Sequence, residues 1–341
     1  MNTMSYVVML LILSGLAALV CWSLTGRLIC QLRMDVPNAR SSHKAPVPRG
    51  GGLAVLICFL PCAAAVIYAL LEQGFLSQSQ TLPWVTLGAG VVALGIVSWF
   101  DDRHALPVIV RLAVQAGCVG MMLMVMEPVT ITADWLPVWL DRLLIFVLWV
   151  GFVNLFNFMD GIDGLAVTES LSILIGLILL AVLFGGLMPE SMAAAALAGA
   201  MLGFGVWNWR PARVFLGDVG SVPVGFVLGF LLLRLAGEGY GAAAIIFPLY
   251  YLADGGLTFL GRLCRGEAVW QAHRQHVYQR AALALGRHDA VVVRIMAANL
   301  ALILITLAGW HYPAAYLLAP LVVATLLWNL HRARPARQKK A

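Results

Sequence analysis

Eleven long apolar segments constrain the fold of this chain more than any other feature. Each is about 17 to 23 residues long, the length of α-helix needed to cross a hydrocarbon core roughly 30 Å thick. The alternating pattern of a β-strand is not evident in the sequence. We therefore predict an all-α, polytopic integral membrane protein with about 11 transmembrane helices. The predicted spans are 5–25, 51–71, 83–100, 109–126, 142–158, 165–187, 191–209, 219–236, 240–261, 290–308 and 312–330.

Composition supports this prediction and indicates a single membrane domain over residues 1–341. Hydrophobic residues make up 62% of the chain and charged residues 11%, against roughly 25% charged residues in a soluble domain. The first apolar segment has no basic stretch before it and no small-residue cleavage pattern after it, so we expect it to be retained. The six cysteines form no CxxC pair and mostly lie in the spans, which is typical of small core residues.

The basic residues predict the orientation of the chain, because Lys and Arg accumulate in cytoplasmic loops. Of the 22 Lys and Arg residues, 20 lie in alternate connections. These connections are 26–50, 101–111, 208–218, 262–294 and the tail after 330. We therefore place the N-terminus outside and the C-terminus in the cytoplasm. Topology accounts for the net charge of +6, so we expect no nucleic-acid partner.

Acidic residues also collect on the predicted cytoplasmic side, although an ionisable group within a span costs roughly 2.5 to 3.5 kcal/mol. They are Asp101, Asp102, Asp160, Asp163 and Asp218 at predicted helix ends, and Asp254 in or near the end of the ninth span. Acids brought together repel one another unless a cation is present. Mg²⁺ is the natural candidate, because it takes one or two carboxylates and substrate phosphate oxygens. The glycines of PRGGG, DGIDG and FLGDVGS predict backbone N–H groups that approach an anion.

Each of these motifs has an ordinary structural interpretation when taken alone. Asp-Gly is a common turn signal, and an aspartate at a helix start is often an N-cap. Most basic loop residues set orientation, and tryptophans such as Trp207 and Trp209 commonly lie at a membrane interface. His273 and His276, taken alone, are also compatible with a position at that interface and no role in a site. The combination on one side of the membrane is what favours a metal and phosphate site.

Five motifs in order resemble the polyprenyl-phosphate N-acetylhexosamine-1-phosphate transferases, which include the phospho-N-acetylmuramoyl-pentapeptide and GlcNAc-1-phosphate transferases. The resemblance covers residues 35–280. The matching segments are the pair Asp101-Asp102 with Arg111 and Gln115, NLFNFMDGIDGLA at 154–166, NWRPARVFLGDVGS at 208–221, Asp254, and AHRQH at 272–276. The family's catalytic loops would then lie near 26–50, 101–111, 154–166, 207–221 and 262–290.

The resemblance implies transfer of an N-acetylhexosamine-1-phosphate from a UDP-sugar to undecaprenyl phosphate, giving a diphosphate-linked lipid and UMP. It implies Mg²⁺ as the cofactor, with Mn²⁺ as an alternative, and a multi-pass protein of the bacterial inner (cytoplasmic) membrane. The N-terminus would be periplasmic and the active site would be on the cytoplasmic face. The expected partners are the two substrates and the lipid bilayer, and a homodimer is one assembly that this interpretation allows.

The same resemblance implies roles for individual residues. Asp218 would be the principal metal ligand, with Asp102 as a second. Asp101 or Asp102 would position or deprotonate the lipid phosphate, and Phe215 would stack on uracil. The other substrate-binding residues would be Lys44, Asn154, Asn157, Asp160, Asp163, Asn208, His273 and His276. Among these, Asp160, Asp163 and Asn208 would bind the nucleoside or order its pocket.

The last loop departs from the family, because many members have a tight run of histidines where this chain has HRQH. That difference disfavours the cell-wall pentapeptide substrate. SSHKAPVPRGGG and AHRQHVYQR instead resemble the branch that begins O-antigen or related surface polysaccharides, with UDP-N-acetylated hexosamines, often 6-deoxy, as donors.

A membrane lipid or solute carrier, with inner-face acids coupled to cations, is the alternative function. A carrier should show ionisable groups near the bilayer midplane and broken helices in repeated halves, and neither is clear in the sequence. A CDP-alcohol phosphotransferase would need a DGxxAR pattern, whereas LAVTE follows DGIDG in this chain.

Overall fold

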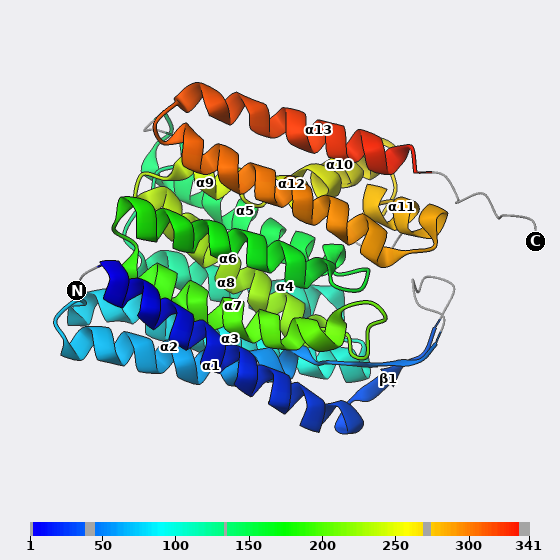
Figure 1. Cartoon of the computed structure of the whole chain (residues 1–341), viewed down its shortest axis with the longest axis horizontal. Helices are drawn as coiled ribbons and strands as arrows, with labels where there is room; N and C mark the ends of the chain where they lie inside the picture. Colours follow the sequence, from blue (N-terminus) through cyan, green and yellow to red (C-terminus); the bar gives the residue numbers. More distant parts are fainter. Residues whose placement is uncertain (1–2, 38–44, 133–134, 269–273, 334–341) are drawn as a thin grey trace, which may run out of the picture.

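Long α-helices that run side by side make up most of the molecule (Figure 1). The structure is a computed structural model that describes residues 3–37, 45–132, 135–268 and 274–333. Its α-helices are α1 (Thr3–Leu28), α2 (Gly52–Glu72), α3 (Gln78–His104), α4 (Val108–Val125), α5 (Val138–Met159), α6 (Leu165–Phe184), α7 (Met188–Asn208), α8 (Asp218–Gly237), α9 (Gly241–Ile246), α10 (Leu249–Cys264), α11 (Val277–Leu285), α12 (His288–Gly309) and α13 (Leu318–His331). Short 3-10 helices η1 (Ile29–Gln31) and η2 (Pro313–Leu317) follow α1 and α12.

The predicted all-helical membrane architecture is confirmed. Within the described residues, ten helices are long and apolar enough to cross a membrane. The span predicted at 240–261 differs, because it is divided into α9 and α10 at Phe247 and Pro248. Proline lacks a backbone N–H and cannot continue the hydrogen-bond ladder of α9, so it is suited to such a break.

One small sheet departs from the all-helical prediction. Strands β1 (Arg33–Asp35) and β2 (Val47–Arg49) pair antiparallel, with Arg33 opposite Arg49. Beyond it, Arg49 forms a parallel bridge with Phe215 in the connection between α7 and α8. Three-residue strands are too short to give an alternating sequence pattern, which explains why the sequence did not predict them.

Several residues of the predicted catalytic loops lie in helix ends. α3 continues to His104, so Asp101 and Asp102 lie in its last turn. α4 begins at Val108 and therefore carries Arg111. Likewise, α5 extends through Asn157 to Met159. Side chains on a helix end are held more firmly than those on a loop, which suits a site that needs fixed geometry.

Glycines allow helix backbones to approach closely. A Cβ added to Gly199 of α7 would lie 2.2 Å from the Ser14 carbonyl oxygen of α1, and one on Gly203 would lie 2.2 Å from that of Ala18. A Cβ on Gly52 would lie 2.2 Å from the Gly220 Cα, where α2 meets the start of α8. Packing of this kind replaces the hydrophobic effect as a cause of helix association in lipid.

The glycines of PRGGG do not present the anion-binding amides predicted from the sequence. The N–H groups of Gly50 and Gly51 both donate to the Phe215 carbonyl, at 3.1 and 2.9 Å, and that of Gly52 donates to the Leu216 carbonyl at 2.9 Å. The N–H of Gly161 donates to the carbonyl oxygen of Met159 at 2.9 Å. The glycines of PRGGG therefore join the start of α2 to the connection before α8, whereas Gly161 closes a local turn.

The polar connections lie at one end of the molecule. In Figure 1, α1 begins at the left-hand end, and β1 lies at the right-hand end, where α13 also ends. Which end faces the cytoplasm stays a prediction from the basic residues.

We expect a membrane-impermeant maleimide applied to intact cells to label Glu72→Cys and not His104→Cys. Both positions are exposed. Glu72 ends α2, just before the connection to α3, and His104 ends α3, so α3 lies between them. The exposed cysteines Cys30 and Cys264 should first be changed to serine. Labelling of His104→Cys from outside would reverse the orientation, and labelling of both after permeabilisation is the control.

Candidate functional site

A cluster of three carboxylates and two guanidinium groups lies where the last turn of α3 and the first turn of α4 meet the start of α8. Arg49 places its Nη2 2.6 Å from Asp218 Oδ1 and its Nε 3.0 Å from Asp102 Oδ1. Arg111 places its Nη1 2.8 Å from Asp101 Oδ2 and 3.8 Å from Asp218 Oδ2. The formal charge of these five groups is −1, so the cluster keeps an excess of negative charge.

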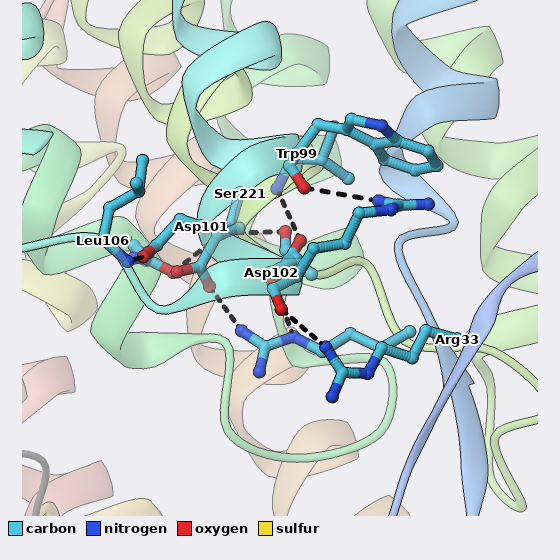
Figure 2. Close-up of polar contacts among 12 residues, drawn as sticks. Arg33, Trp99, Asp101, Asp102, Leu106 and Ser221 are labelled. Atoms are coloured by element: carbon cyan, nitrogen blue, oxygen red, sulfur yellow. Dashed lines mark hydrogen bonds and ion pairs between the residues drawn. The ribbon is translucent and has the colours of Figure 1, made fainter.

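The two acids of α3 have different environments, which Figure 2 shows together with their polar partners. Asp101 accepts a hydrogen bond from the Leu106 N–H at 2.7 Å as well as from Arg111, so both of its oxygens have partners. Asp102 accepts from the Val219 N–H at 3.2 Å, in the first turn of α8. A carboxylate is stabilised at that position by the helix dipole.

Two pockets meet at this cluster. The polar pocket, of about 630 Å³, is lined by Arg33, Asp35, Arg49, Trp99, Arg103 and His104 among others, together with Asp101, Asp102 and Asp218. The apolar pocket, of about 440 Å³, is lined by Asp101, Arg111 and Asp218 and by apolar side chains that include Leu94, Leu112, Val147, Val150 and Phe259. Asp101 and Asp218 line both pockets, whereas Arg49 lines the polar one and Arg111 the apolar one.

Asn154 and Asn157 belong to the wall of the apolar pocket. The Asn154 amide donates to Gln115 Oε1 at 2.6 Å, which ties α5 to α4. The Ser221 hydroxyl donates to Asn157 Oδ1 at 2.8 Å, which ties α8 to α5. Neither asparagine lines the polar pocket. The structure therefore brings both to the cluster, on the side lined by apolar residues.

Asp160, directly after α5, lies within electrostatic reach of the cluster. Burial raises the pKa of its carboxyl to about 7; Arg49 opposes this, and Asp218, Asp102 and Asp163 reinforce it. Burial is the largest cause of this raised pKa, and the nearby carboxylates add to it.

Asp163 and Asn208 hold the connections of the site together. Asp163 Oδ1 lies 3.1 Å from His288 Nδ1, and its Oδ2 accepts from the Ala212 N–H at 3.2 Å. Burial would raise the pKa of Asp163, but the bond and charge of His288 outweigh it and lower the pKa. Asn208 accepts from the Gly164 N–H at 3.0 Å and donates to the Val214 carbonyl at 2.9 Å. These contacts support the expectation that both residues order the pocket.

Phe215 lies beside Arg49, because the two residues form the parallel bridge between β2 and the connection to α8. Its N–H donates to the Pro48 carbonyl at 2.8 Å. Neighbouring strands lie about 4.8 Å apart, and paired residues project to the same face. The aromatic ring therefore belongs to the surroundings of the carboxylate cluster, although Phe215 lines neither pocket.

In the last predicted motif, the described residues Asp254 and His276 contact each other and the start of α11, and a substrate contact of His276 stays a prediction. Asp254 is fully buried and accepts from the N–H groups of Val277 and Tyr278, at 2.9 and 3.1 Å, at the start of α11. His276 is buried against it, with Nδ1 3.6 Å from Asp254 Oδ1, and lines neither pocket at the cluster. Lys44 and His273 lie outside the described residues.

The carboxylates fit a magnesium ion. Asp102 and Asp218 are close enough for one cation, the Arg49 guanidinium, to contact both. Asp102 Oδ1 is buried, and its described close contact is the ion pair with Arg49 Nε at 3.0 Å. In that part of the chain no group of three or more His, Cys, Asp or Glu side chains could hold a metal. Mg²⁺ suits such a set, because it commonly takes one or two carboxylates and completes its shell with water and phosphate oxygens.

Sequence reasoning missed Arg49 and His288 as members of the site. From the sequence, Arg49 was assigned only to the basic residues that set orientation. Its position in the glycine-rich segment PRGGG could have indicated a place in the site. His288 follows the last motif by twelve residues, and nothing in its local sequence relates it to Asp163.

Comparisons with known proteins agree on one family. Residues 84–236 match the model of glycosyl transferase family 4. The chain is 30% identical over 287 residues to the decaprenyl-phosphate N-acetylglucosaminephosphotransferase of Mycolicibacterium smegmatis, covering 72% of this chain and 67% of the relative. It is 27% identical over 287 residues to the probable undecaprenyl-phosphate N-acetylglucosaminyl 1-phosphate transferase of Bacillus subtilis, covering 80% and 76%. It is 34% identical over 225 residues to the phospho-N-acetylmuramoyl-pentapeptide-transferase of a Nostoc species, covering 60% and 56%.

Proposed function

Because the chain belongs to glycosyl transferase family 4, we propose that it transfers an N-acetylhexosamine-1-phosphate from a UDP-sugar to undecaprenyl phosphate. The products are a diphosphate-linked lipid and UMP. The observation that carries the proposal is the pair of pockets, one polar and one apolar, that share Asp101 and Asp218; Arg49 of the cluster lines the polar pocket and Arg111 the apolar one. Such a site accommodates one water-soluble and one lipid-soluble reactant.

The lipid acceptor fits the apolar pocket. Its walls come from the membrane helices α3, α4, α5, α8 and from Phe259 of α10, which suits a polyprenyl chain. Arg111 stands where that pocket meets the carboxylates, and its side chain is 33% exposed. A guanidinium binds phosphate oxygens through paired hydrogen bonds. Arg111 therefore orients the acceptor phosphate toward the cluster.

The nucleotide-sugar fits the polar pocket and its surroundings. Arg49, Arg33 and Arg103 supply positive charge for a diphosphate, and the neighbouring Phe215 supplies an aromatic face for uracil. Lys44 and His273 stay proposed contacts of the donor. Asp163 and Asn208 order the connections next to the site, and Asp160 stays a proposed contact of the nucleoside.

The reaction exchanges one phosphoryl bond for another. An oxygen of the lipid phosphate attacks the phosphorus that bears the sugar, and the bond from that phosphorus to the UMP oxygen breaks, so UMP leaves with the bonding electrons. Asp218 and Asp102 would hold Mg²⁺, which would neutralise charge on the diphosphate. Asp101 holds Arg111 in place.

Proposals beyond the family concern the donor, the pathway and the location. We propose a UDP-6-deoxy-N-acetylhexosamine or UDP-GlcNAc donor and a place at the first step of O-antigen or related surface polysaccharide synthesis. The HRQH sequence of the last loop supports this choice over the pentapeptide-bearing donor. The predicted orientation supports an active site on the cytoplasmic face of the inner membrane. A single membrane domain and a homodimer stay proposals as well.

Release of UMP is the expected result when purified protein in detergent receives undecaprenyl phosphate, Mg²⁺ and a panel of UDP-N-acetylhexosamines. Attack on phosphorus leaves one phosphate on uridine, whereas attack at the anomeric carbon would leave UDP. Added UMP should slow or reverse the reaction, because the bonds exchanged have similar energies. Chelator and omission of lipid are the controls. Folded protein that makes no UMP from any donor would contradict the proposal and favour the carrier alternative.

A further inference from the structure

Arg49 occupies the space between Asp102 and Asp218, with nitrogen-to-oxygen distances of 3.0 and 2.6 Å. Two ionised carboxylates this close to one another repel unless a cation lies between them. In the protein alone, the guanidinium supplies that cation. Burial lowers the pKa of Arg49, but Asp218 and Asp102 outweigh this effect and raise it, so the guanidinium stays charged.

The backbone of Arg49 is fixed on both sides, whereas its side chain is partly exposed. β2 pairs with β1 through Arg33 and Arg49, and the bridge to Phe215 lies on the other side. Gly50, with φ +106°, follows at once and donates to the Phe215 carbonyl. The side chain itself is 39% exposed and lines the polar pocket. The guanidinium can therefore turn into the pocket about its own side-chain bonds while its Cα stays in place.

A divalent cation bound by Asp218 and Asp102 would compete with Arg49 for the same carboxylate oxygens. A diphosphate in the polar pocket would offer the guanidinium a new partner, because its planar fork pairs with two phosphate oxygens. Arg111 differs in this respect, since its short contact is with Asp101 and it faces the apolar pocket.

We infer that Arg49 is a positioning residue, a tethered counter-ion that holds Asp102 and Asp218 together without a divalent cation and moves to the donor's diphosphate when that cation binds. The inference rests on the proposed function, because it assumes that these two acids bind the metal. It predicts that Arg49 weakens metal binding to the free protein and couples that binding to the donor. The coupling is reciprocal, as linkage requires.

Mn²⁺ binding followed by electron paramagnetic resonance tests this without measuring turnover. With no nucleotide, Arg49→Met should bind Mn²⁺ about tenfold more tightly than the wild type, within the usual range of coupling between sites. UDP-GlcNAc should tighten Mn²⁺ binding less in Arg49→Met than in the wild type, by a similar factor. Arg49→Lys should lie between them, because a compact ammonium cannot pair with both carboxylates as a guanidinium fork does.

Arg103→Met is the matched control. It removes one positive charge from the same pocket, but Arg103 stacks on Trp99 and donates to its carbonyl, without a described contact to either metal-site acid. Unchanged or weaker Mn²⁺ binding by Arg49→Met, or equal tightening by Arg103→Met, overturns the inference. If Arg49→Met does not fold, Arg49→Lys decides: binding no tighter than the wild type overturns it. Asp218→Asn separates the two ideas, because Mn²⁺ binding that survives this change refutes the proposed metal site itself.

Discussion

Asp218→Asn should reduce UMP release by at least about a hundredfold, the loss typical when one charge-stabilising group is removed from a reaction centre. Asp218 contacts both arginines of the cluster and lines both pockets. The amide keeps the size of the side chain and loses the negative charge that would hold the metal against the diphosphate. No other described residue lies in the same relation to both pockets and both arginines.

The free energy of unfolding of Asp218→Asn, measured by thermal unfolding, should differ from that of the wild type by about 1 kcal/mol. A charge in the first turn of a helix contributes on that scale. Asp35→Asn is a suitable control, because it removes a carboxylate from the wall of the same polar pocket. The control should retain most of the activity. An Asp218→Asn protein as active as the wild type, with the same dependence on Mg²⁺, would remove Asp218 from the proposed role.

Gly52→Ala should impair both stability and activity. The new Cβ would lie 2.2 Å from the Gly220 Cα, 2.5 Å from its nitrogen and 2.9 Å from the Leu216 carbonyl oxygen. All three are backbone atoms, so relief requires α2 and the start of α8 to separate. Overpacking of this kind costs about 1 to 3 kcal/mol. Because Arg49 precedes α2 and Asp218 begins α8, the shift would also misalign the cluster, and a displacement of about 1 Å can cost roughly a hundredfold in rate.

Gly88→Ala provides the matched control, because no atom lies within 4 Å of the Cβ position there. Alanine within a helix is favoured over glycine by about 0.5 to 1 kcal/mol, so this variant should be as stable as the wild type or slightly more so. Differential scanning fluorimetry and UMP release measure the two properties. Equal melting temperatures for Gly52→Ala and Gly88→Ala would show that the α2 and α8 backbones can separate freely.

The sequence was sufficient for the membrane helices and for the motifs, because both depend on local composition. It was less informative about where helices end, since hydropathy falls at Asp101 and Asp102 although α3 continues through them to His104. The break at Pro248 was also missed, because apolar residues continue on both sides of it.

Contacts between distant motifs could not be predicted from one sequence. Arg49 and Asp218 are separated by 169 positions, and Asp163 and Asn208 could have faced either the substrate or the protein. Their partners depend on how α2, α7, α8 and α12 pack, which local pattern does not specify. The same holds for Asp254, whose carboxylate was grouped with the metal candidates and instead binds the first N–H groups of α11.

The two residues shared by the pockets have a consequence for where each substrate of the proposed reaction lies. Asp101 and Asp218 line both a compartment with many charged residues and a compartment with mostly apolar residues. In the proposed reaction the chain would therefore act as a phase-transfer catalyst: the nucleotide would stay in the polar pocket, the polyprenyl tail would stay in the apolar pocket, and only a sugar phosphate would cross between them.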